Sequence, residues 1–158
     1  MTRNNYPTFI PLLTVVFTLL FAGNAHAQSA ELQSHAATLA QSVNPVQSGS
    51  RSYEQSITFS EPAVVKYSYV EADSKGNRTN YAFEFNLADI DPYAVREQTQ
   101  KDVISVTVVA RSKQKLIKSY KNDVVQSYQS QINILASDID NGRKLAETIK
   151  AAIPLAKK

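Results

Sequence analysis

The chain has 158 residues and no cysteine, which excludes thiol catalysis, disulfide bonds, thiolate zinc sites and anchoring through a lipidated N-terminal cysteine. Its 17 Lys and Arg against 14 Asp and Glu leave a net charge of +3, too small an excess to indicate a dedicated nucleic-acid-binding protein. With 43% hydrophobic and 20% charged residues, the composition is that of a globular protein.

Residues 1–27 have the three parts of a secretory signal peptide. A short region with one arginine precedes an apolar run from Phe9 to Gly23, and a polar stretch with two alanines follows. Ala25 and Ala27 supply the small side chains that signal peptidase requires, which predicts cleavage before Gln28. The apolar run is too short for a transmembrane helix. We therefore expect a periplasmic or secreted protein with no transmembrane span after cleavage.

Residues 28–51 are expected to form a short N-terminal helix and a linker. From Ala30 to Val43 the apolar residues recur at helical spacing, and Asn44-Pro45 ends the pattern because a residue before proline avoids the α region. The segment from Val46 to Arg51 contains Gln, Ser and Gly and is typical of a loop. We expect this helix to be held only weakly.

Alternation of apolar and polar residues predicts antiparallel strands from Tyr53 onward. Two of them, at 64–71 and 79–87, flank a turn at 73–77 and form a hairpin. One face of this hairpin is apolar and mostly aromatic: Val65, Tyr67, Tyr69, Tyr81, Phe83, Phe85 and Leu87. The opposite face is polar, as in a sheet that contacts water on one side.

After the hairpin, Asp91 and Pro92 predict a capped turn, and three more strands are expected over 103–110, 116–120 and 124–136. In the first, the inward residues are Ile104, Val106 and Val108. In the last, Tyr128, Ile132 and Ile134 share one face, opposite Ser127, Gln129, Gln131 and Asn133.

A C-terminal helix is predicted over 137–153, with Ser137 as its N-cap and Asp140 three residues later. Its apolar stripe consists of Ile139, Leu145, Ala146, Ile149 and Ile153. We expect this stripe to pack on the aromatic face of the sheet. The sequence therefore predicts a single α+β domain over 52–158, an antiparallel β-meander of about six strands packed against the C-terminal helix.

A cluster of basic residues is the candidate binding site. It consists of Arg111, Lys113, Lys115, Lys118 and Lys121, with no acidic residue among them. Such a hairpin attracts anionic lipid headgroups or polysaccharides, provided that the chain stays extended through Ser112 and Gln114. The alternative is that the charged lysines only prevent a sheet edge from pairing with strands of other chains.

Three further sets of residues are candidates for catalysis, metal binding or ligand binding. On an extended backbone, the side chains of Asp89 and Asp91 would point to the same side and form a carboxylate pair or a cation site. A turn and its cap also explain these two residues. His35, the one histidine after the expected cleavage site, has no partner at triad or metal-ligand spacing, so we expect no catalytic residue, metal or cofactor. The strand tyrosines either line a sugar or peptide groove or pack under a helix.

Over Tyr81 to Pro92, the Lys115 to Tyr120 strand and the closing Asp138 to Pro154 helix, the chain resembles small secreted bacterial proteins of unassigned activity. The order of a strand meander and one C-terminal helix, over about residues 52–154, also resembles the pleckstrin-homology-like fold. That resemblance implies a scaffold for binding rather than a particular activity.

These observations predict a noncatalytic binding protein of the cell envelope, with an envelope protein or an anionic ligand as its partner. The alternative is a hydrolase that uses carboxylates such as Asp89 and Asp91 on envelope or extracellular glycans. A deep pocket with two carboxylates about 5–10 Å apart would favour the hydrolase.

Overall fold

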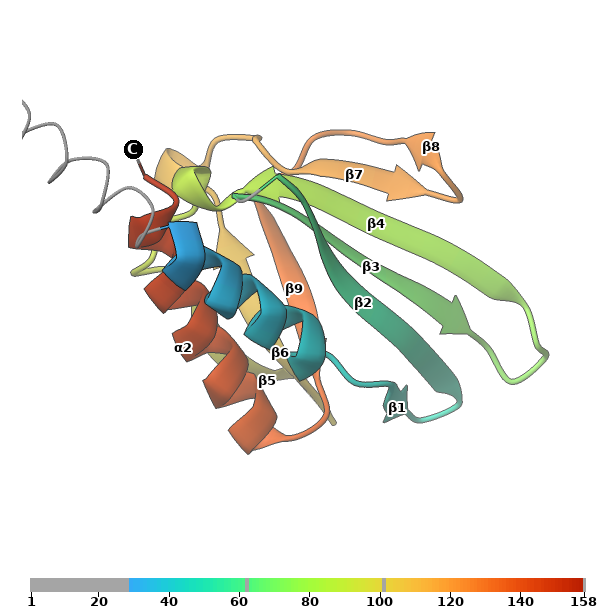
Figure 1. Ribbon diagram of the computed structural model, residues 1–158. Helices are drawn as coiled ribbons and strands as arrows, with labels where there is room; N and C mark the ends of the chain where they lie inside the picture. Colours follow the sequence, from blue (N-terminus) through green and yellow to red (C-terminus); the bar gives the residue numbers. More distant parts are fainter. Residues whose placement is uncertain (1–28, 62, 101, 158) are drawn as a thin grey trace, which may run out of the picture.

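The structure, a computed structural model, describes residues 29–61, 63–100 and 102–157. The expected signal peptide and its cleavage site lie outside the described residues. The fold is α+β, with a six-stranded antiparallel sheet, a three-stranded antiparallel sheet and two helices that pack together (Figure 1). The predicted fold class is confirmed.

The large sheet has the order β1-β2-β3-β4-β7-β8. Its strands are β1 (Val46–Ser48), β2 (Arg51–Glu61), β3 (Val64–Ala72), β4 (Arg78–Asn86), β7 (Lys118–Lys121) and β8 (Val124–Val125). The small sheet has the order β5-β6-β9, with β5 (Arg96–Gln100), β6 (Val103–Val109) and β9 (Gln131–Ala136). Two short 3-10 helices, η1 (Leu87–Asp89) and η2 (Arg111–Lys113), follow β4 and β6.

The hairpin of β3 and β4 has the predicted faces. Tyr67 pairs with Phe83 and Val65 with Phe85, so these side chains share one face of the sheet. Val65 and Tyr67 are 2% and 0% exposed. The face is shared because paired residues in antiparallel strands point the same way.

The later strands differ from the prediction. The segment expected as one strand over 124–136 forms β8 and β9 in different sheets, with non-strand residues between them, and Tyr128 is 49% exposed. A single alternating pattern does not reveal where a chain leaves one sheet for another. β1 and β5 were also missed, because their mostly polar residues resemble loop.

The N-cap of the C-terminal helix α2 (Ile139–Leu155) lies one residue later than predicted. The N-cap is Asp138, whose carboxylate accepts a hydrogen bond from the Asn141 N–H at 2.7 Å, and not Ser137. Ile139, predicted in the apolar stripe, is 49% exposed, whereas Leu145 is buried. Ile139 is the first residue of α2.

The helix α2 lies closest to β5, β6, β9 and η1, and its buried side chains share one core cluster with Val65, Tyr67 and Phe85 of the large sheet. Its approach to the small sheet is close at Gly142, where an added Cβ would lie 3.2 Å from the Ile104 Cγ2 atom. Glycine permits this distance because it has no side chain.

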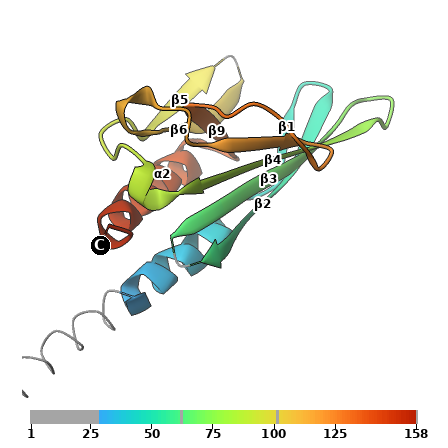
Figure 2. The ribbon, with the colours of Figure 1, turned by 90° about the horizontal axis from the view of Figure 1, so that it is seen from above.

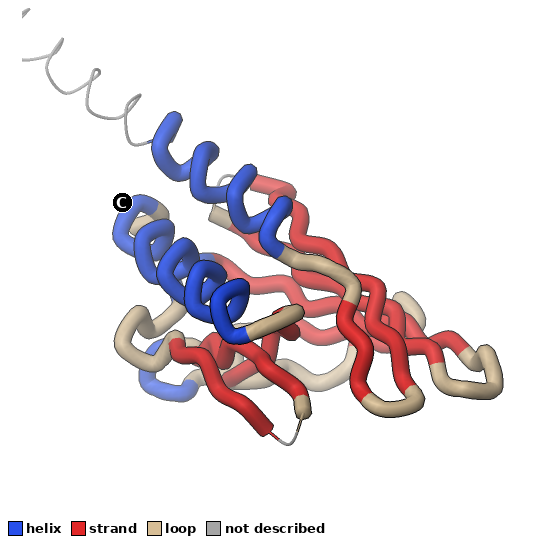
Figure 3. Tube along the Cα trace, turned by 90° about the horizontal axis from the view of Figure 1, so that it is seen from below, coloured by secondary structure: helices blue, strands red, loops and turns tan. Residues whose placement is uncertain are grey.

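The N-terminal helix, residues 29–42, lies beside α2 (Figure 3). Leu32 and Leu39 are buried in the same core cluster as α2 and both sheets. The Asn141 side-chain amide also donates to the Ser42 carbonyl at 2.8 Å. The helix is therefore part of the core, against our expectation of a weak attachment.

The core occupies only one end of the large sheet. Seen from above, the small sheet and α2 lie over that end, while β2, β3 and β4 continue past them (Figure 2). On the continuing part of the inner face, Tyr53, Tyr69 and Tyr81 are only partly buried. This arrangement leaves a cleft where the small sheet stops and the large sheet continues.

Candidate binding cleft between the two sheets

The cleft has a volume of about 450 Å³. One wall is the inner face of β2, β3 and β4, and the other is β9 with the residues just before it and the start of β6. Its lining residues are Tyr53, Tyr69, Glu71, Phe83, Val103, Gln129, Gln131, Ile132, Asn133 and Leu135. A volume of this size is within the range of ligand-binding sites in proteins.

A hydrogen-bond network joins the two walls at the inner end of the cleft. The hydroxyl of Tyr67 donates to the Gln55 Oε1 atom at 2.8 Å and accepts from the Leu135 N–H at 3.3 Å. The Gln55 amide donates in turn to the Leu135 carbonyl at 3.1 Å. Burial raises the pKa of Tyr67, so its hydroxyl stays protonated at neutral pH. The network orients β9 with one edge toward the aromatic face.

The aromatic wall is a set of rings in mutual contact. Tyr69 lies at its centre, with its ring centroid 5.0 Å from Tyr81, 5.9 Å from Tyr53 and 6.3 Å from Phe83. Burial, followed by the neighbouring Tyr81, raises the pKa of Tyr69 to about 12. Its hydroxyl forms no hydrogen bond with the described residues, so it is available to a ligand.

One carboxylate, that of Glu71, occurs among the described residues that line the cleft. It forms an ion pair with Arg51 at 2.9 Å. A hydrogen bond with the Tyr53 side chain, and then the charge of Glu71, raise the pKa of Arg51. The charges at this end of the cleft are therefore balanced, and the remaining lining is aromatic, aliphatic and amide.

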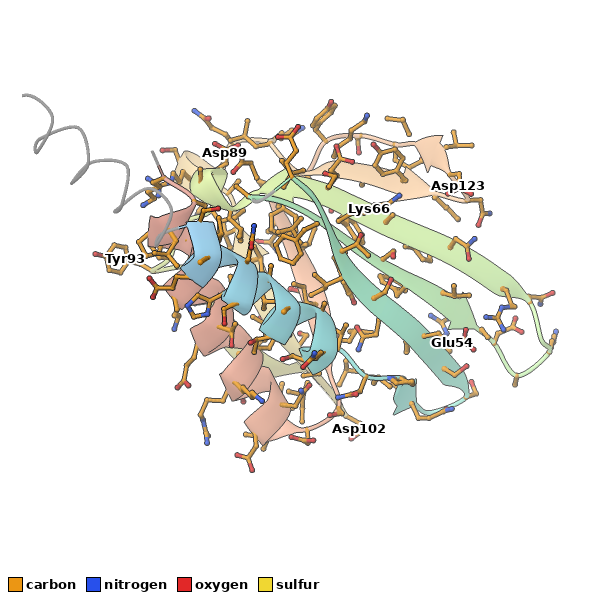
Figure 4. The ribbon with its side chains drawn as sticks, in the orientation of Figure 1. Glu54, Lys66, Asp89, Tyr93, Asp102 and Asp123 are labelled. Atoms are coloured by element: carbon orange, nitrogen blue, oxygen red, sulfur yellow. The ribbon has the colours of Figure 1, made fainter. Side chains whose placement is uncertain are left out.

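A smaller hollow of about 240 Å³ lies on the outer face of the large sheet. Its lining includes Ser56 and Ser68, whose hydroxyls bond to each other at 2.9 Å, and Glu54, which pairs with Arg78 at 2.6 Å. Figure 4 shows Glu54 on this sheet. These four groups satisfy one another, whereas Lys66 and Asp123, which also line the hollow, form no ion pair among the described residues.

The predicted basic residues do not follow one face of an extended strand. The chain is not extended at Ser112 and Lys113, which lie in η2 and have positive φ values of 52° and 55°. Lys118 pairs with Glu84 and Lys121 with Tyr81, so these two lysines lie on opposite faces of β7.

The individual basic side chains have different surroundings. Lys118 and Lys121 place their ammonium groups 5.0 and 5.9 Å from the ring centroids of Tyr120 and Tyr81. Lys113 and Lys115 are exposed, whereas Arg111 is partly buried with its Nε and Nη2 atoms unpaired among the described residues.

The alternative of an Asp89–Asp91 carboxylate pair on an extended backbone is not realised, because Asp89 belongs to η1. Asp91 accepts a hydrogen bond from the Tyr93 N–H at 3.0 Å, which confirms its role in a turn. Figure 4 shows Asp89 at the opposite end of the large sheet from Glu54. Neither aspartate lines the cleft.

His35 is partly buried in the N-terminal helix. Within residues 29–61, 63–100 and 102–157, no group of three or more His, Asp and Glu side chains is arranged to hold a metal ion. In the same part of the chain, no helix has the length and apolar character needed to span a membrane.

The tyrosine face follows from the sequence pattern, whereas the residues opposite it in the cleft do not. Gln129, Gln131 and Asn133 were placed on the polar face of a long strand, where they signalled only exposure to solvent. The alternation of polar residues beside the buried Ile132 and Ile134 indicates a solvated face of the strand, and it does not indicate whether the strand edge is paired. Comparison with protein-family models, with curated proteins and with solved structures finds no match.

Proposed function

We propose that this protein is a noncatalytic binding protein of the cell envelope and that the cleft between the two sheets is its ligand site. The observation that carries the proposal is the chemistry of the cleft: a contiguous aromatic wall faces main-chain and amide groups, and the one lining carboxylate is already paired with Arg51. Aromatic surfaces with a few convergent polar groups are typical of binding sites. The signal-peptide pattern of residues 1–27 supports the envelope location.

The alternative, a carboxylate-dependent hydrolase, has less support. Glycoside hydrolysis by such enzymes uses two carboxylates that flank the scissile bond. In the cleft, Glu71 has no second carboxylate beside it among the described lining residues. Asp89 and Asp91 serve a 3-10 helix and a turn elsewhere.

The proposal is tested by site-specific photo-crosslinking in cells that produce the protein. A benzophenone amino acid replaces Gln131, an exposed residue of the cleft, or Lys144, an exposed residue of α2, as the matched control. We expect an adduct from position 131 and not from position 144. The adduct should weaken when Tyr53→Ser is added, provided that thermal unfolding shows that the variant is folded.

Equal labelling at the two positions, or no adduct at position 131, would show that the cleft is not the ligand site. Hydrolysis of envelope glycans by the purified protein, lost in a Glu71→Gln variant, would favour the hydrolase instead.

A further inference from the structure

The edge of β9 that faces away from β6 is occupied at both ends and open between them. Before β9, Gln129 exchanges two main-chain hydrogen bonds with Ile117, at 2.7 and 3.0 Å. At the other end, the N–H and C=O of Leu135 bond to the side chains of Tyr67 and Gln55. Between these two points, no hydrogen bond within the described residues involves the main chain of this edge.

The open groups belong to Gln131 and Asn133. In an antiparallel pair, main-chain groups point alternately toward and away from the partner strand. Ser130 bonds toward the small sheet, to the Ala110 N–H at 2.8 Å, and Leu135 bonds away from it. Asn133 and Gln131 lie two and four residues before Leu135, so their main-chain groups point to the same side as those of Leu135. Their N–H and C=O groups therefore point into the cleft. Both residues are exposed, and both line the cleft.

This pattern of donors and acceptors matches a polypeptide backbone. Each residue offers one N–H and one C=O, and two residues along a strand are about 6.8 Å apart. The stretch from Gln129 to Leu135 spans about 20 Å, with its two ends occupied. It therefore has room for an extended segment of about four residues, which would become the fourth strand of the small sheet.

The opposite wall suits the side chains of such a segment. A strand added to β9 would face Tyr53, Tyr69 and Phe83, which line the cleft on the side of the large sheet. Alternate side chains of the segment would then contact these rings. Because Glu71 is paired with Arg51, the cleft does not favour a charged segment.

We infer that the ligand of the cleft is an extended, uncharged segment of a partner polypeptide, about four residues long, that pairs with Gln131 and Asn133 and places an apolar or aromatic side chain on Tyr69 and Phe83. This inference rests on the proposed function, since it names the ligand class of the same site.

The probe is a phage-displayed library of random heptapeptides, selected on the purified protein. The best binder is synthesised together with two analogues. One analogue is N-methylated at the odd-numbered amides and the other at the even-numbered amides, so that each blocks one edge of the extended peptide. Only one edge of the added strand faces β9, so one analogue should lose at least tenfold in affinity and the other should bind nearly as well as the parent peptide. In NMR hydrogen exchange, the peptide should protect the amides of Gln131 and Asn133.

Two protein variants separate main-chain from side-chain recognition. Gln131→Pro removes the open N–H and should weaken peptide binding at least tenfold, since proline is tolerated where the strand edge is unpaired. Gln131→Ala keeps the N–H, so its loss of affinity should be smaller than that of Gln131→Pro. If Gln131→Pro does not fold, the two N-methylated analogues decide the question on the wild-type protein.

The inference is overturned if no peptide is selected, if both N-methylated analogues bind equally, or if protection appears away from β9. A concentration-dependent dimer that protects the same amides would identify a second copy of this chain as the occupant and would also overturn it. The proposed function is tested separately, because it requires the photo-adduct at position 131. If that adduct is a glycan and not a protein, the proposed function holds and the inference of a polypeptide ligand is refuted.

Discussion

Replacing Tyr67 with Phe tests the network that joins the two sheets. The change keeps the ring, which is fully buried, and removes only the hydroxyl. Two hydrogen bonds are lost, the one to Gln55 at 2.8 Å and the one from the Leu135 N–H at 3.3 Å. A net hydrogen bond contributes about 0.5–1.5 kcal/mol, and a partner left unpaired in the core adds to the loss. Because the second bond is long, we expect a total of about 2 kcal/mol.

The assay is equilibrium unfolding in urea, followed by far-UV circular dichroism because the chain has no tryptophan. Tyr69→Phe is the matched control: it removes a hydroxyl without a hydrogen bond in the described structure and should cost less than about 0.5 kcal/mol. In a double-mutant cycle with Gln55→Leu, the coupling to Tyr67→Phe should be about 1 kcal/mol. A Tyr67→Phe cost below about 0.5 kcal/mol, or no coupling, would refute the network as a source of stability.

Three further predictions concern the core, the alkaline limb of stability and the cap of α2. Phe85→Ala, at a side chain that is 4% exposed, should cost about 3–5 kcal/mol in urea unfolding, and Phe83→Ala, which lines the cleft, should cost less; the reverse order would mean that the core ends elsewhere. The pKa of Tyr69 is about 12 in the folded protein and about 10 in an unfolded chain, so the unfolded state loses its proton first and stability falls as pH rises from 10 to 12. The loss of stability between pH 9 and pH 11, measured by urea midpoints, should be smaller in Tyr69→Phe than in the wild type. An equal loss in the two proteins would contradict the burial of this hydroxyl. Asp138→Ala should lower the thermal midpoint by a few degrees and Ser137→Ala should hardly change it, whereas equal effects would argue against Asp138 as the N-cap.

Much of the local structure was predictable because it depends on neighbours in the sequence. The period of two in β3 and β4 gave their faces, and the short turn between them gave their pairing. The spacing of apolar residues gave α2 almost to its ends. The N-cap was assigned one residue early because Ser137 and Asp138 are both good capping residues, and only the observed hydrogen bond to Asn141 distinguishes them.

The candidate site was not predictable in the same way. The basic residues were grouped because they are close in sequence, but the left-handed backbone at Ser112 and Lys113 prevents the extended conformation that one strand face requires. The positive φ values came without a glycine, the usual signal of such a turn. Spacing in sequence therefore indicated a strand face that the backbone does not form.

The sequence by itself determined which residues alternate, where the helices form and that an aromatic face exists, because these properties follow from local periods of two and 3.6 residues. Only the tertiary structure decided that β7 pairs with β4 and β9 with β6, and that α2 covers the small sheet. The cleft depends on these pairings, since Leu135 meets Tyr67 across 68 residues of chain. Contacts between residues so far apart in the sequence arise from the packing of whole sheets. Alternation within one strand does not indicate which distant strand will lie beside it.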